Sequence, residues 1–358
     1  MAKIELSNIS HTYNPNDTNP TYALNPFSMT WENGKRYAIL GPSGCGKTTM
    51  LNIVSGLVRP SKGKILFDEN DVTDLITEER NIAQVFQFPV IYNTMTIYDN
   101  LAFPVRCRNK KEKKIEERVK SVSDTLRLSS FLNSPARKLT ADQKQLISLG
   151  RGLVREDVAG VLMDEPLTVI DPDLKFRLRR NLKEINEQYK TTLVYVTHDQ
   201  NEAMTFADNI IVMDQGEIVQ VGLPKDLFEK PRTTFVGYFI GSPAMNLFNS
   251  EILSDNSIMF NNDTIKTKTD LSKIKDKNVK LGIRSEFIKI ATDQKENIVS
   301  VKVTRVEDFG NFKLITGKAG DLEIKSKVER EIPISTEELK LHLPAEKCCI
   351  YSNEMLVN

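Results

Sequence analysis

The sequence lacks any apolar run near the roughly 20 residues that a membrane-spanning helix needs. Its net charge of only +1 gives no excess of one sign, which excludes an acidic tail and a basic surface for nucleic acid. The N-terminal Met1-Ala2-Lys3 is followed by alternating polar residues, so no signal peptide is expected. We therefore expect a protein that is soluble or that binds a membrane through a partner.

Cysteine is also scarce. The four cysteines have no spacing typical of metal ligands; they are Cys45, Cys107, Cys348 and Cys349. The adjacent Cys348 and Cys349 could form only a strained disulfide, so a reducing, cytoplasmic compartment is expected. With 358 residues, of which 40% are hydrophobic, the chain is long enough for two domains with buried cores.

One glycine-rich stretch carries a specific motif. Residues 41–49 fit the pattern G-x-x-x-x-G-K-[ST], between a predicted buried strand at 36–40 and a predicted helix at 50–54. The glycines let successive N–H groups turn inward around a phosphate, and the helix directs its positive end to the same anion. Lys47 adds a cation for the β- and γ-phosphates, and Thr48 adds a hydroxyl for Mg²⁺. The residues expected to bind nucleotide are Gly41, Ser43, Gly44, Cys45, Gly46, Lys47, Thr48 and Thr49.

Cys45 is expected to lie among these inward-facing amides, beside Lys47 and the helix N-terminus. Such surroundings favour the thiolate form of cysteine. We therefore expect alkylation of Cys45 to block ATP binding, and bound ATP to slow the alkylation.

Two carboxylates follow a predicted buried strand at 161–163. In a phosphate-loop NTPase, Asp164 at this place would hold Mg²⁺, directly or through water, and Glu165 would act as the general base. The alternative is a carboxylate pair that caps a helix. His198 follows another predicted strand at 193–197, and the carboxyl end of such a strand places it to touch a phosphate.

Tyr13 follows the first predicted strand, at 4–9, and precedes the phosphate loop. It is a candidate to stack on adenine, because base–aromatic stacking contributes about 1–3 kcal/mol whatever the base. The alternative is an ordinary packing residue at the edge of the sheet.

The pattern of the sequence changes after about residue 235. Before it, two hairpins are predicted, one joining 27–31 to 35–40 and one joining 210–213 to 217–220. After it, short strands recur at 258–260, 279–283, 287–291, 298–306, 312–316 and 321–327, which is typical of a small β-barrel or sandwich. We predict an α/β domain at 1–235 and a β domain at 236–358.

Together these motifs resemble those of ABC transporter nucleotide-binding subunits, in the same order along the chain. The residues that carry the resemblance are Tyr13, the loop at 41–49, Gln87, Asp164, Glu165, Asp171 and His198. Segments 241–246 and 282–286 resemble the β domain of maltose-type ATPases for carbohydrate or glycerol-phosphate import, and segments 84–106 and 139–155 look most like glycerol importers. The resemblance implies an α/β P-loop ATPase domain with a helical subdomain at about 88–158, followed by a small all-β, OB-like regulatory domain of the TOBE type.

The resemblance also implies cofactors and residue roles. ATP and Mg²⁺ would be bound, with Thr48, Gln87 and Asp164 near the metal. Gln87 would sense Mg²⁺ and link the site to membrane subunits, and Asp171 would lie in a loop that touches the opposite subunit. His198 would contact the γ-phosphate and orient the attacking water.

The implied partners are integral membrane permease subunits, a second ATPase subunit and, indirectly, an extracytoplasmic solute-binding protein, with no nucleic acid. A coupling helix of the permease would enter a groove in the 88–158 stretch, and the β domain would mediate subunit contacts or regulation. The chain would be a peripheral protein at the cytoplasmic face of the membrane.

One departure concerns the family's signature, Leu-Ser-Gly-Gly-Gln, which completes the ATP site of the opposite subunit. The corresponding residues here are Leu139, Thr140, Ala141, Asp142 and Gln143. Ala141 restricts the backbone, and Asp142 brings a negative charge near a γ-phosphate, although it also favours the positive end of its own helix. Two like charges about 4 Å apart repel by roughly 4 kcal/mol at an effective dielectric constant of about 20. A site completed by this segment could therefore be slow or inactive.

Three hypotheses follow. Glu165 and His198 favour an ATPase subunit that powers solute import, whereas the altered signature favours a degenerate nucleotide-binding partner with little hydrolysis. A heterodimer would reconcile the two, because the site built on this chain's phosphate loop would meet an intact signature of its partner. A soluble ABC ATPase of repair or translation is disfavoured by the strand-rich C-terminal region and the single phosphate loop.

Overall fold

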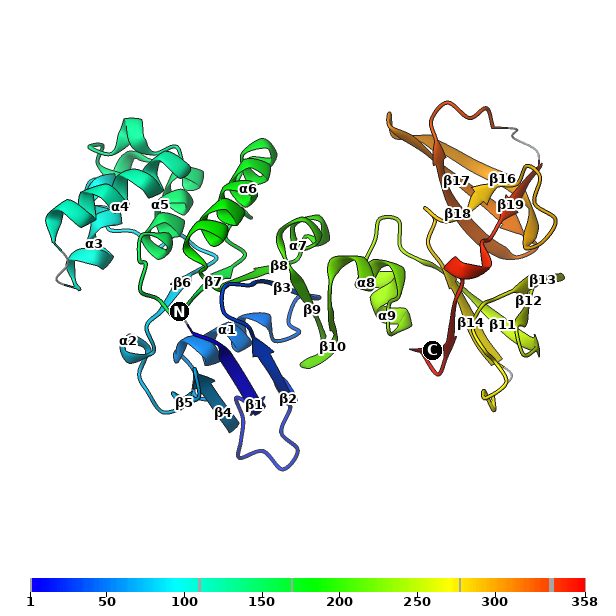
Figure 1. The fold of residues 1–358 in the computed structure, drawn as a ribbon, viewed down its shortest axis with the longest axis horizontal. Helices are drawn as coiled ribbons and strands as arrows, with labels where there is room; N and C mark the ends of the chain where they lie inside the picture. Colours follow the sequence, from blue (N-terminus) through cyan, green and yellow to red (C-terminus); the bar gives the residue numbers. More distant parts are fainter. Residues whose placement is uncertain (1, 109–110, 169, 277, 335–337, 358) are drawn as a thin grey trace. The chain divides into compact units, whose positions relative to one another are not determined.

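The computed structural model describes residues 2–108, 111–168, 170–276, 278–334 and 338–357. The internal contacts divide the chain into two compact units, residues 1–224 and 225–358. The predicted boundary near residue 235 lies in the second of these units, within α9 (Thr234–Phe239). Figure 1 shows the elements of both units.

The first unit is built on a six-stranded sheet of order β10-β9-β3-β8-β7-β6. Its strands are β3 (Arg36–Leu40), β6 (Ile82–Val85), β7 (Gly160–Asp164), β8 (Leu193–Thr197), β9 (Asn209–Asp214) and β10 (Glu217–Gly222). All pairs are parallel except β9 and β10, which form the predicted hairpin. Because β3 lies between β8 and β9, the phosphate loop that follows it starts at the carboxyl edge of the sheet, away from either end.

A second, antiparallel sheet in this unit has the order β2-β1-β4-β5. Its strands are β1 (Ile4–His11), β2 (Leu24–Trp31), β4 (Lys62–Phe67) and β5 (Asn70–Asp71). The predicted hairpin between 27–31 and 35–40 is therefore wrong, since β2 pairs with β1 while β3 pairs with β8 and β9. Residues 37–40 are all buried, which suits a strand inside a parallel sheet rather than one in an isolated two-stranded ribbon.

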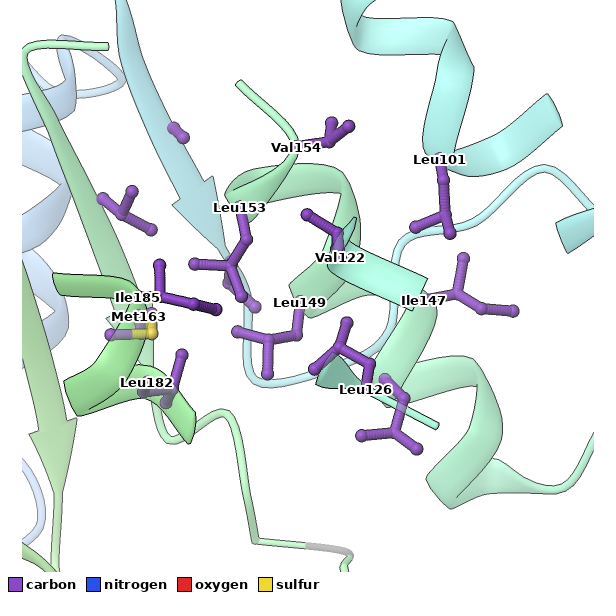
Figure 2. Packing of buried hydrophobic residues seen from close by; sticks show 14 of the residues in the cluster. Leu101, Val122, Leu126, Ile147, Leu149, Leu153, Val154, Met163, Leu182 and Ile185 are labelled. Carbon is purple, nitrogen blue, oxygen red and sulfur yellow. The ribbon is translucent and has the colours of Figure 1, made fainter. Parts of the chain in front are cut away.

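The helices of the first unit are α1 (Lys47–Ser55), α2 (Thr77–Arg80), α3 (Ile97–Arg106), α4 (Glu112–Thr125), α5 (Ala141–Leu153), α6 (Pro172–Tyr189) and α7 (Gln200–Phe206), with 3₁₀ turns at Ser129–Phe131 and Ala136–Lys138. Helices α3 to α7 belong to one hydrophobic cluster and α1 belongs to a second, and both clusters include residues of the six-stranded sheet. Figure 2 shows Leu149 and Leu153 of α5 packed among Val122 of α4 and Leu182 and Ile185 of α6. This packing holds the predicted helical subdomain against the sheet and α6.

The second unit is the expected all-β domain, with two antiparallel sheets of order β13-β12-β11-β14-β20-β21 and β15-β19-β16-β17-β18. The strands are β11 (Asn246–Ser254), β12 (Ser257–Phe260), β13 (Asp263–Lys266), β14 (Asn278–Ile283), β15 (Lys289–Ile290), β16 (Ile298–Asp308), β17 (Phe312–Ala319), β18 (Leu322–Glu329), β19 (Glu338–His342), β20 (Cys349–Ser352) and β21 (Met355–Leu356). Helical segments are α8 (Pro224–Glu229), α9 and a 3₁₀ turn at Ala345–Lys347. Among the described residues, no helix is long and apolar enough to cross a bilayer.

The buried guanidinium of Arg284 joins the helical and β parts of the second unit. It follows β14, is fully buried, and donates hydrogen bonds of 2.9 Å to the carbonyl of Phe228 and 2.7 Å to the carbonyl of Gly237. Burial lowers the pKa of Arg284 to about 10, so the side chain stays charged at neutral pH. These bonds fix α8 and α9 to the sheet that contains β14.

Candidate active site

The phosphate loop is packed closely against its surroundings at two glycines. A Cβ on Gly41 would lie 2.3 Å from the carbonyl oxygen of Met213, at the end of β9. Gly46 has a φ of +101°, and a Cβ there would lie 2.5 Å from the carbonyl oxygen of Ala23. Both positions therefore need glycine for reasons of space, and Gly46 needs it for its backbone conformation as well.

Lys47 points its ammonium group back into the loop. Its Nζ donates hydrogen bonds of 2.8 Å to the carbonyl oxygens of Gly41 and Pro42, and the residue is only 7% exposed. The loop thus holds a buried cation beside its own inward-turning backbone, which makes it a site for an anion.

Thr48 and Asp164 meet although they are far apart in the sequence. The Thr48 hydroxyl donates a hydrogen bond of 2.8 Å to Oδ2 of Asp164. Asp164 is 6% exposed; burial raises the pKa of its carboxyl from the ordinary value of 3.8, and the neighbouring Glu165 adds to the shift. A hydroxyl and a carboxylate are oxygen donors of the kind that Mg²⁺ prefers, so the pair fits the predicted metal.

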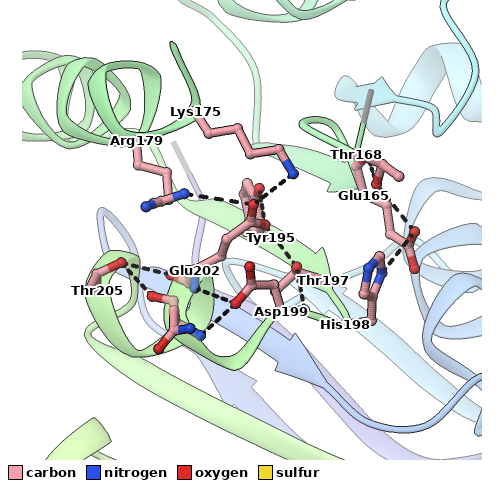
Figure 3. A network of polar contacts seen from close by, with 11 residues as sticks. Glu165, Thr168, Lys175, Arg179, Tyr195, Thr197, His198, Asp199, Glu202 and Thr205 are labelled. Atoms are coloured by element: carbon pink, nitrogen blue, oxygen red, sulfur yellow. Dashed lines mark hydrogen bonds and ion pairs between the residues drawn. The ribbon is translucent and has the colours of Figure 1, made fainter. Parts of the chain in front are cut away.

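Glu165 receives side chains from two other elements, as Figure 3 shows in part. Its Oε2 accepts a hydrogen bond of 3.2 Å from Nε2 of Gln87 and lies 3.3 Å from Nδ1 of His198. The backbone of Glu165 has a φ of +44°, an uncommon conformation for a residue with a side chain, and its N–H donates 3.0 Å to the carbonyl of Val196. Three of the predicted site residues are therefore in direct contact at the carboxyl ends of β7 and β8.

Tyr13 lies beside the loop rather than in it. Its hydroxyl is 3.1 Å from the Thr49 hydroxyl, and its ring meets His11 edge to face with 4.6 Å between the centroids. Tyr13 is 59% exposed, so much of the ring is open to solvent. Stacking on adenine and edge packing both stay predictions.

The altered signature forms the start of α5. Thr140 caps the helix: its backbone N–H donates 3.1 Å to the side chain of Gln143, and its side chain accepts from the backbone in return. The Thr140 hydroxyl also donates to the carboxylate of Asp142. Within the described residues, no hydrogen bond joins residues 139–143 to residues 41–49.

Asp171 likewise serves as a helix cap. Its side chain accepts a hydrogen bond of 3.0 Å from the backbone N–H of Asp173 at the start of α6, whose first residue is Pro172. The structure thus places Asp171 at a helix N-terminus but does not test its predicted contact with a second subunit.

The thiolate form expected for Cys45 disagrees with the structure, whereas the effect of its alkylation on ATP binding stays a prediction. Its side chain is 3% exposed, and burial raises the pKa of the thiol despite the nearby ammonium of Lys47, 3.8 Å away. The thiol belongs to a hydrophobic cluster of the first unit, which the loop pattern alone could not indicate.

Residues that the motifs did not indicate also touch the site. The Thr168 hydroxyl lies 3.4 Å from Oε2 of Glu165, and its hydrogen bond of 3.1 Å to the Glu165 carbonyl holds the turn after β7. Behind His198, the buried carboxylate of Glu202 binds both α6 and β8. Neither Thr168 nor Glu202 belongs to a motif that predicts its contacts, because these contacts arise only when distant parts of the chain fold together.

A small cavity of about 200 Å³ lies in the helical part of the first unit. It is lined by residues of β6, α3 and α5 and the segment between β6 and α3, among them Phe86, Val90, Ser148 and Arg151. Apolar side chains beside it are exposed, and Phe88 is 78% exposed. This cavity is a candidate for the groove predicted in the 88–158 stretch.

Comparisons with known proteins agree with this geometry. The sequence model of the family "ABC transporter" matches residues 24–168. The chain is 35% identical to the sn-glycerol-3-phosphate import ATP-binding protein UgpC of Pectobacterium atrosepticum, over 99% of this chain and 98% of the relative. It is 38% identical to the trehalose/maltose import ATP-binding protein MalK of Thermococcus litoralis, over 83% of this chain and 84% of the relative.

Solved structures are similar to the ATPase part of the chain. The ATP-binding cassette MJ0796, in a post-hydrolysis dimer bound to ADP and Pi, aligns with a TM-score of 0.56 and 28% identity. The alignment covers 62% of this chain and 98% of that one. The ADP conformation of the cassette MJ1267 aligns with a TM-score of 0.56 and 25% identity, over 64% of this chain and 96% of that one.

Proposed function

The chain belongs to the ABC transporter family, and we propose that it energises the import of a carbohydrate or a polyol such as glycerol or glycerol 3-phosphate. It is an ATP-binding and ATP-hydrolysing subunit that uses Mg²⁺ and works as a dimer with membrane permease subunits and a solute-binding protein. The cytoplasmic face of the membrane is its proposed location, because ATP is available there.

For nucleotide binding we assign the phosphate loop. Lys47 exchanges its bonds to the carbonyls of Gly41 and Pro42 for bonds to phosphate oxygens, while the backbone N–H groups of the loop and α1 surround the anion. Thr48, Gln87 and Asp164 are the residues proposed to hold Mg²⁺, which neutralises charge on the phosphate oxygens. Tyr13 is proposed to stack on the adenine.

For hydrolysis we assign Glu165 and His198. Glu165 takes a proton from the attacking water, and its contacts with Gln87 and His198 hold the carboxylate in place. His198 is 61% exposed at its side chain, so it can also reach a γ-phosphate and orient the water. The segment 140–143 and Asp171 are proposed to face the ATP site of the other subunit.

Similarity along nearly the whole chain is the observation that carries the proposed solute class. The relative named for glycerol-3-phosphate import matches both the ATPase unit and the all-β unit, and so do further relatives of that name. The chain is thus similar to complete importer ATPases and not only to a shared ATPase domain. The degenerate-partner hypothesis rests on the altered signature alone.

The test is transport in proteoliposomes. The full chain would be assembled with the membrane subunits and the solute-binding protein encoded beside it, and uptake of radiolabelled sn-glycerol 3-phosphate, glycerol and maltose would be measured with ATP inside. We expect one of these solutes both to be taken up and to stimulate ATP hydrolysis.

Lys47→Ala is the matched control, since it removes the phosphate-binding cation and should abolish uptake of every solute. If none of the three solutes were transported or stimulated hydrolysis in a complex that hydrolyses ATP, the proposed solute class would be rejected. If the complex bound no ATP, the proposed nucleotide site would be rejected instead.

A further inference from the structure

A buried carboxylate lies behind His198 and takes no part in the proposed chemistry. Glu202, on α7, is 4% exposed. Its Oε2 accepts hydrogen bonds of 2.8 Å from the hydroxyls of Tyr195 and Thr197, both on β8 (Figure 3). A charge removed from water in this way is costly unless it is paired, so its surroundings need an explanation.

The pairing comes from a different helix. Oε1 of Glu202 lies 3.6 Å from Nζ of Lys175 and 3.6 Å from a guanidinium nitrogen of Arg179. These two residues are four apart on α6 and therefore share one face of it. One oxygen of the carboxylate thus binds β8 and the other binds α6.

The bond to Thr197 leads directly to His198. The Thr197 hydroxyl donates its hydrogen to Glu202, and its oxygen accepts a hydrogen bond of 3.0 Å from the backbone N–H of Asp199. Asp199 in turn caps α7, with its side chain accepting 2.7 Å from the N–H of Asn201. The backbone is therefore held on both sides of His198.

His198 itself has little else to fix it. Its side chain is 61% exposed, and within the part of the chain that the structure describes its side-chain polar contact is the 3.3 Å approach to Glu165. The backbone of such a residue fixes its Cα–Cβ bond and thereby limits which rotamers bring the ring to Glu165. The bonds of Thr197 and Asp199 thus fix the Cα–Cβ direction from which the imidazole projects.

The other end of this connection is the start of α6. Asp171 caps that helix, and Lys175 and Arg179 lie one and two turns further on. A displacement of α6 along or around its axis would move both cations relative to Glu202. Because Glu202 is bonded to Thr197, the same displacement would also shift Thr197 and the backbone at His198.

We propose that Glu202 is a positioning residue that orients His198 toward Glu165 and makes this orientation depend on the position of α6. The proposal rests on the proposed role of His198 in hydrolysis. A purely structural Glu202 would stabilise the unit without changing the rate per bound ATP.

The test compares variants in the full chain assembled with its membrane subunits. Glu202→Gln keeps the shape but removes the charge that holds Lys175 and Arg179. Glu184→Gln is the matched control, because Glu184 is an exposed carboxylate on α6 whose ion pair is with Arg180, at 3.3 Å. Steady-state turnover, the KM for MgATP and the thermal unfolding midpoint would be measured for each.

We expect Glu202→Gln to lower kcat about tenfold or more while the KM for MgATP changes less than about twofold, because misplacing a catalytic group affects the chemical step. Glu184→Gln should leave both constants unchanged. Thr197→Val removes only the hydroxyl that joins Glu202 to the backbone at His198, so it should reproduce the loss of kcat. It keeps the test decisive if Glu202→Gln does not fold.

A double-mutant cycle separates positioning from general damage. In a His198→Ala background, Glu202→Gln or Thr197→Val should cause little further loss of single-turnover phosphate release from radiolabelled ATP, since the positioned group is gone. A full additional loss, or an unchanged kcat in folded Glu202→Gln and Thr197→Val, would overturn the proposal. If His198→Ala alone left kcat unchanged, the proposed role of His198 would fail instead.

Discussion

The imidazole Nδ1 of His198 lies 3.3 Å from Oε2 of Glu165. Gln87 contacts the same oxygen, at 3.2 Å, from a third part of the chain. Both contacts are with Oε2, as is the 3.4 Å approach of the Thr168 hydroxyl, so we expect Oε1 to accept the proton from water. Each residue of the site is therefore proposed to have its own role, which a single substitution can test.

Glu165→Gln should stop hydrolysis while keeping the ATP-bound dimer. Glutamine preserves the shape of the side chain and can still contact His198, but it cannot act as a base, so we expect turnover to fall at least about a hundredfold. Phosphate release and size-exclusion chromatography in MgATP would measure the two effects. Turnover at the wild-type rate would mean that another group is the base.

Gly46→Ala should unfold the phosphate loop, whereas Gly44→Ala should not. Both glycines have positive φ, which costs an alanine about 1–2 kcal/mol. Only at Gly46 does the new Cβ also meet a backbone oxygen, that of Ala23 at 2.5 Å; at Gly44 nothing lies within 4 Å. Urea unfolding without nucleotide should therefore show the larger loss of stability for Gly46→Ala. Equal losses would contradict the packing described for the loop.

Cys107 should be the first cysteine to react with iodoacetamide at neutral pH. It is exposed, whereas Cys45, Cys348 and Cys349 are buried. Burial raises the pKa of Cys45, and that of Cys348 to about 12, so these thiols stay protonated and unreactive at neutral pH. Mass mapping of the alkylated peptides over time would give the order.

Cys107→Ser is the control for this experiment and should remove the fast phase of alkylation. Rapid modification of Cys45 in the native protein would instead support the reactive thiolate that the loop motif alone predicts.

Asp164→Asn should make the nucleotide-free protein more stable at neutral pH. The folded-state pKa of Asp164 is raised, so the native state favours the protonated carboxyl and the charged form opposes folding above that pKa. The difference between variant and wild type should shrink as the pH is lowered through the folded pKa toward 3.8. Each kcal/mol relieved corresponds to a rise of roughly 2–4 °C in the unfolding midpoint.

The same variant should lose most of the extra stability that MgATP gives to the wild type, because Asp164 is a proposed metal ligand. Thermal melts with and without MgATP would measure both effects. If Asp164→Asn had a lower unfolding midpoint than the wild type at neutral pH without nucleotide, the charge of Asp164 would not be destabilising the folded state.

Asp142→Gly tests how the subunits pair. In a homodimer, both ATP sites would carry the altered signature and its charge; in a heterodimer with an intact partner, one site would be free of it. The Thr140 hydroxyl donates to Asp142, so Asp142→Gly also frees that hydroxyl for a phosphate. We hypothesise a heterodimer, in which Asp142→Gly raises activity only at the weaker site.

ATP turnover and transport would be measured with and without a second ATPase encoded nearby. Full turnover and transport by this chain alone would exclude the heterodimer and the degenerate-partner hypothesis together. Asp142→Gly should then change the rate little.

Local motifs allowed much of the site to be predicted. The strand, loop and helix around residues 36–55 follow from glycine, lysine and apolar residues that are adjacent in sequence. The contact between Thr48 and Asp164 agrees with the prediction that both lie near one metal. The pairing of β3 was mispredicted, because its closeness in sequence to residues 27–31 suggested a hairpin, whereas the continuous burial of residues 37–40 belongs to a strand inside a parallel sheet.

Contacts between elements that are distant in sequence could not be predicted from the sequence. The burial of Cys45 depends on packing around the loop, and the environment of Glu202 depends on how α6, α7 and β8 meet. Neither residue has a local pattern that distinguishes it from an exposed cysteine or an ordinary helical glutamate. The special environments of Cys45 and Glu202 can be recognised only when the contacts of each buried side chain are known.

The bonds of Arg284 bear on how this chain can be recombined with its relatives. A chimera that exchanged only residues 236–358 would separate Arg284 from the carbonyl of Phe228, with which its guanidinium forms a hydrogen bond. A junction before Pro224 would transfer α8, α9 and β14 together and keep the guanidinium of Arg284 with the carbonyls of Phe228 and Gly237. To graft a different all-β unit onto this ATPase, the junction should therefore be placed before α8 and not before β11.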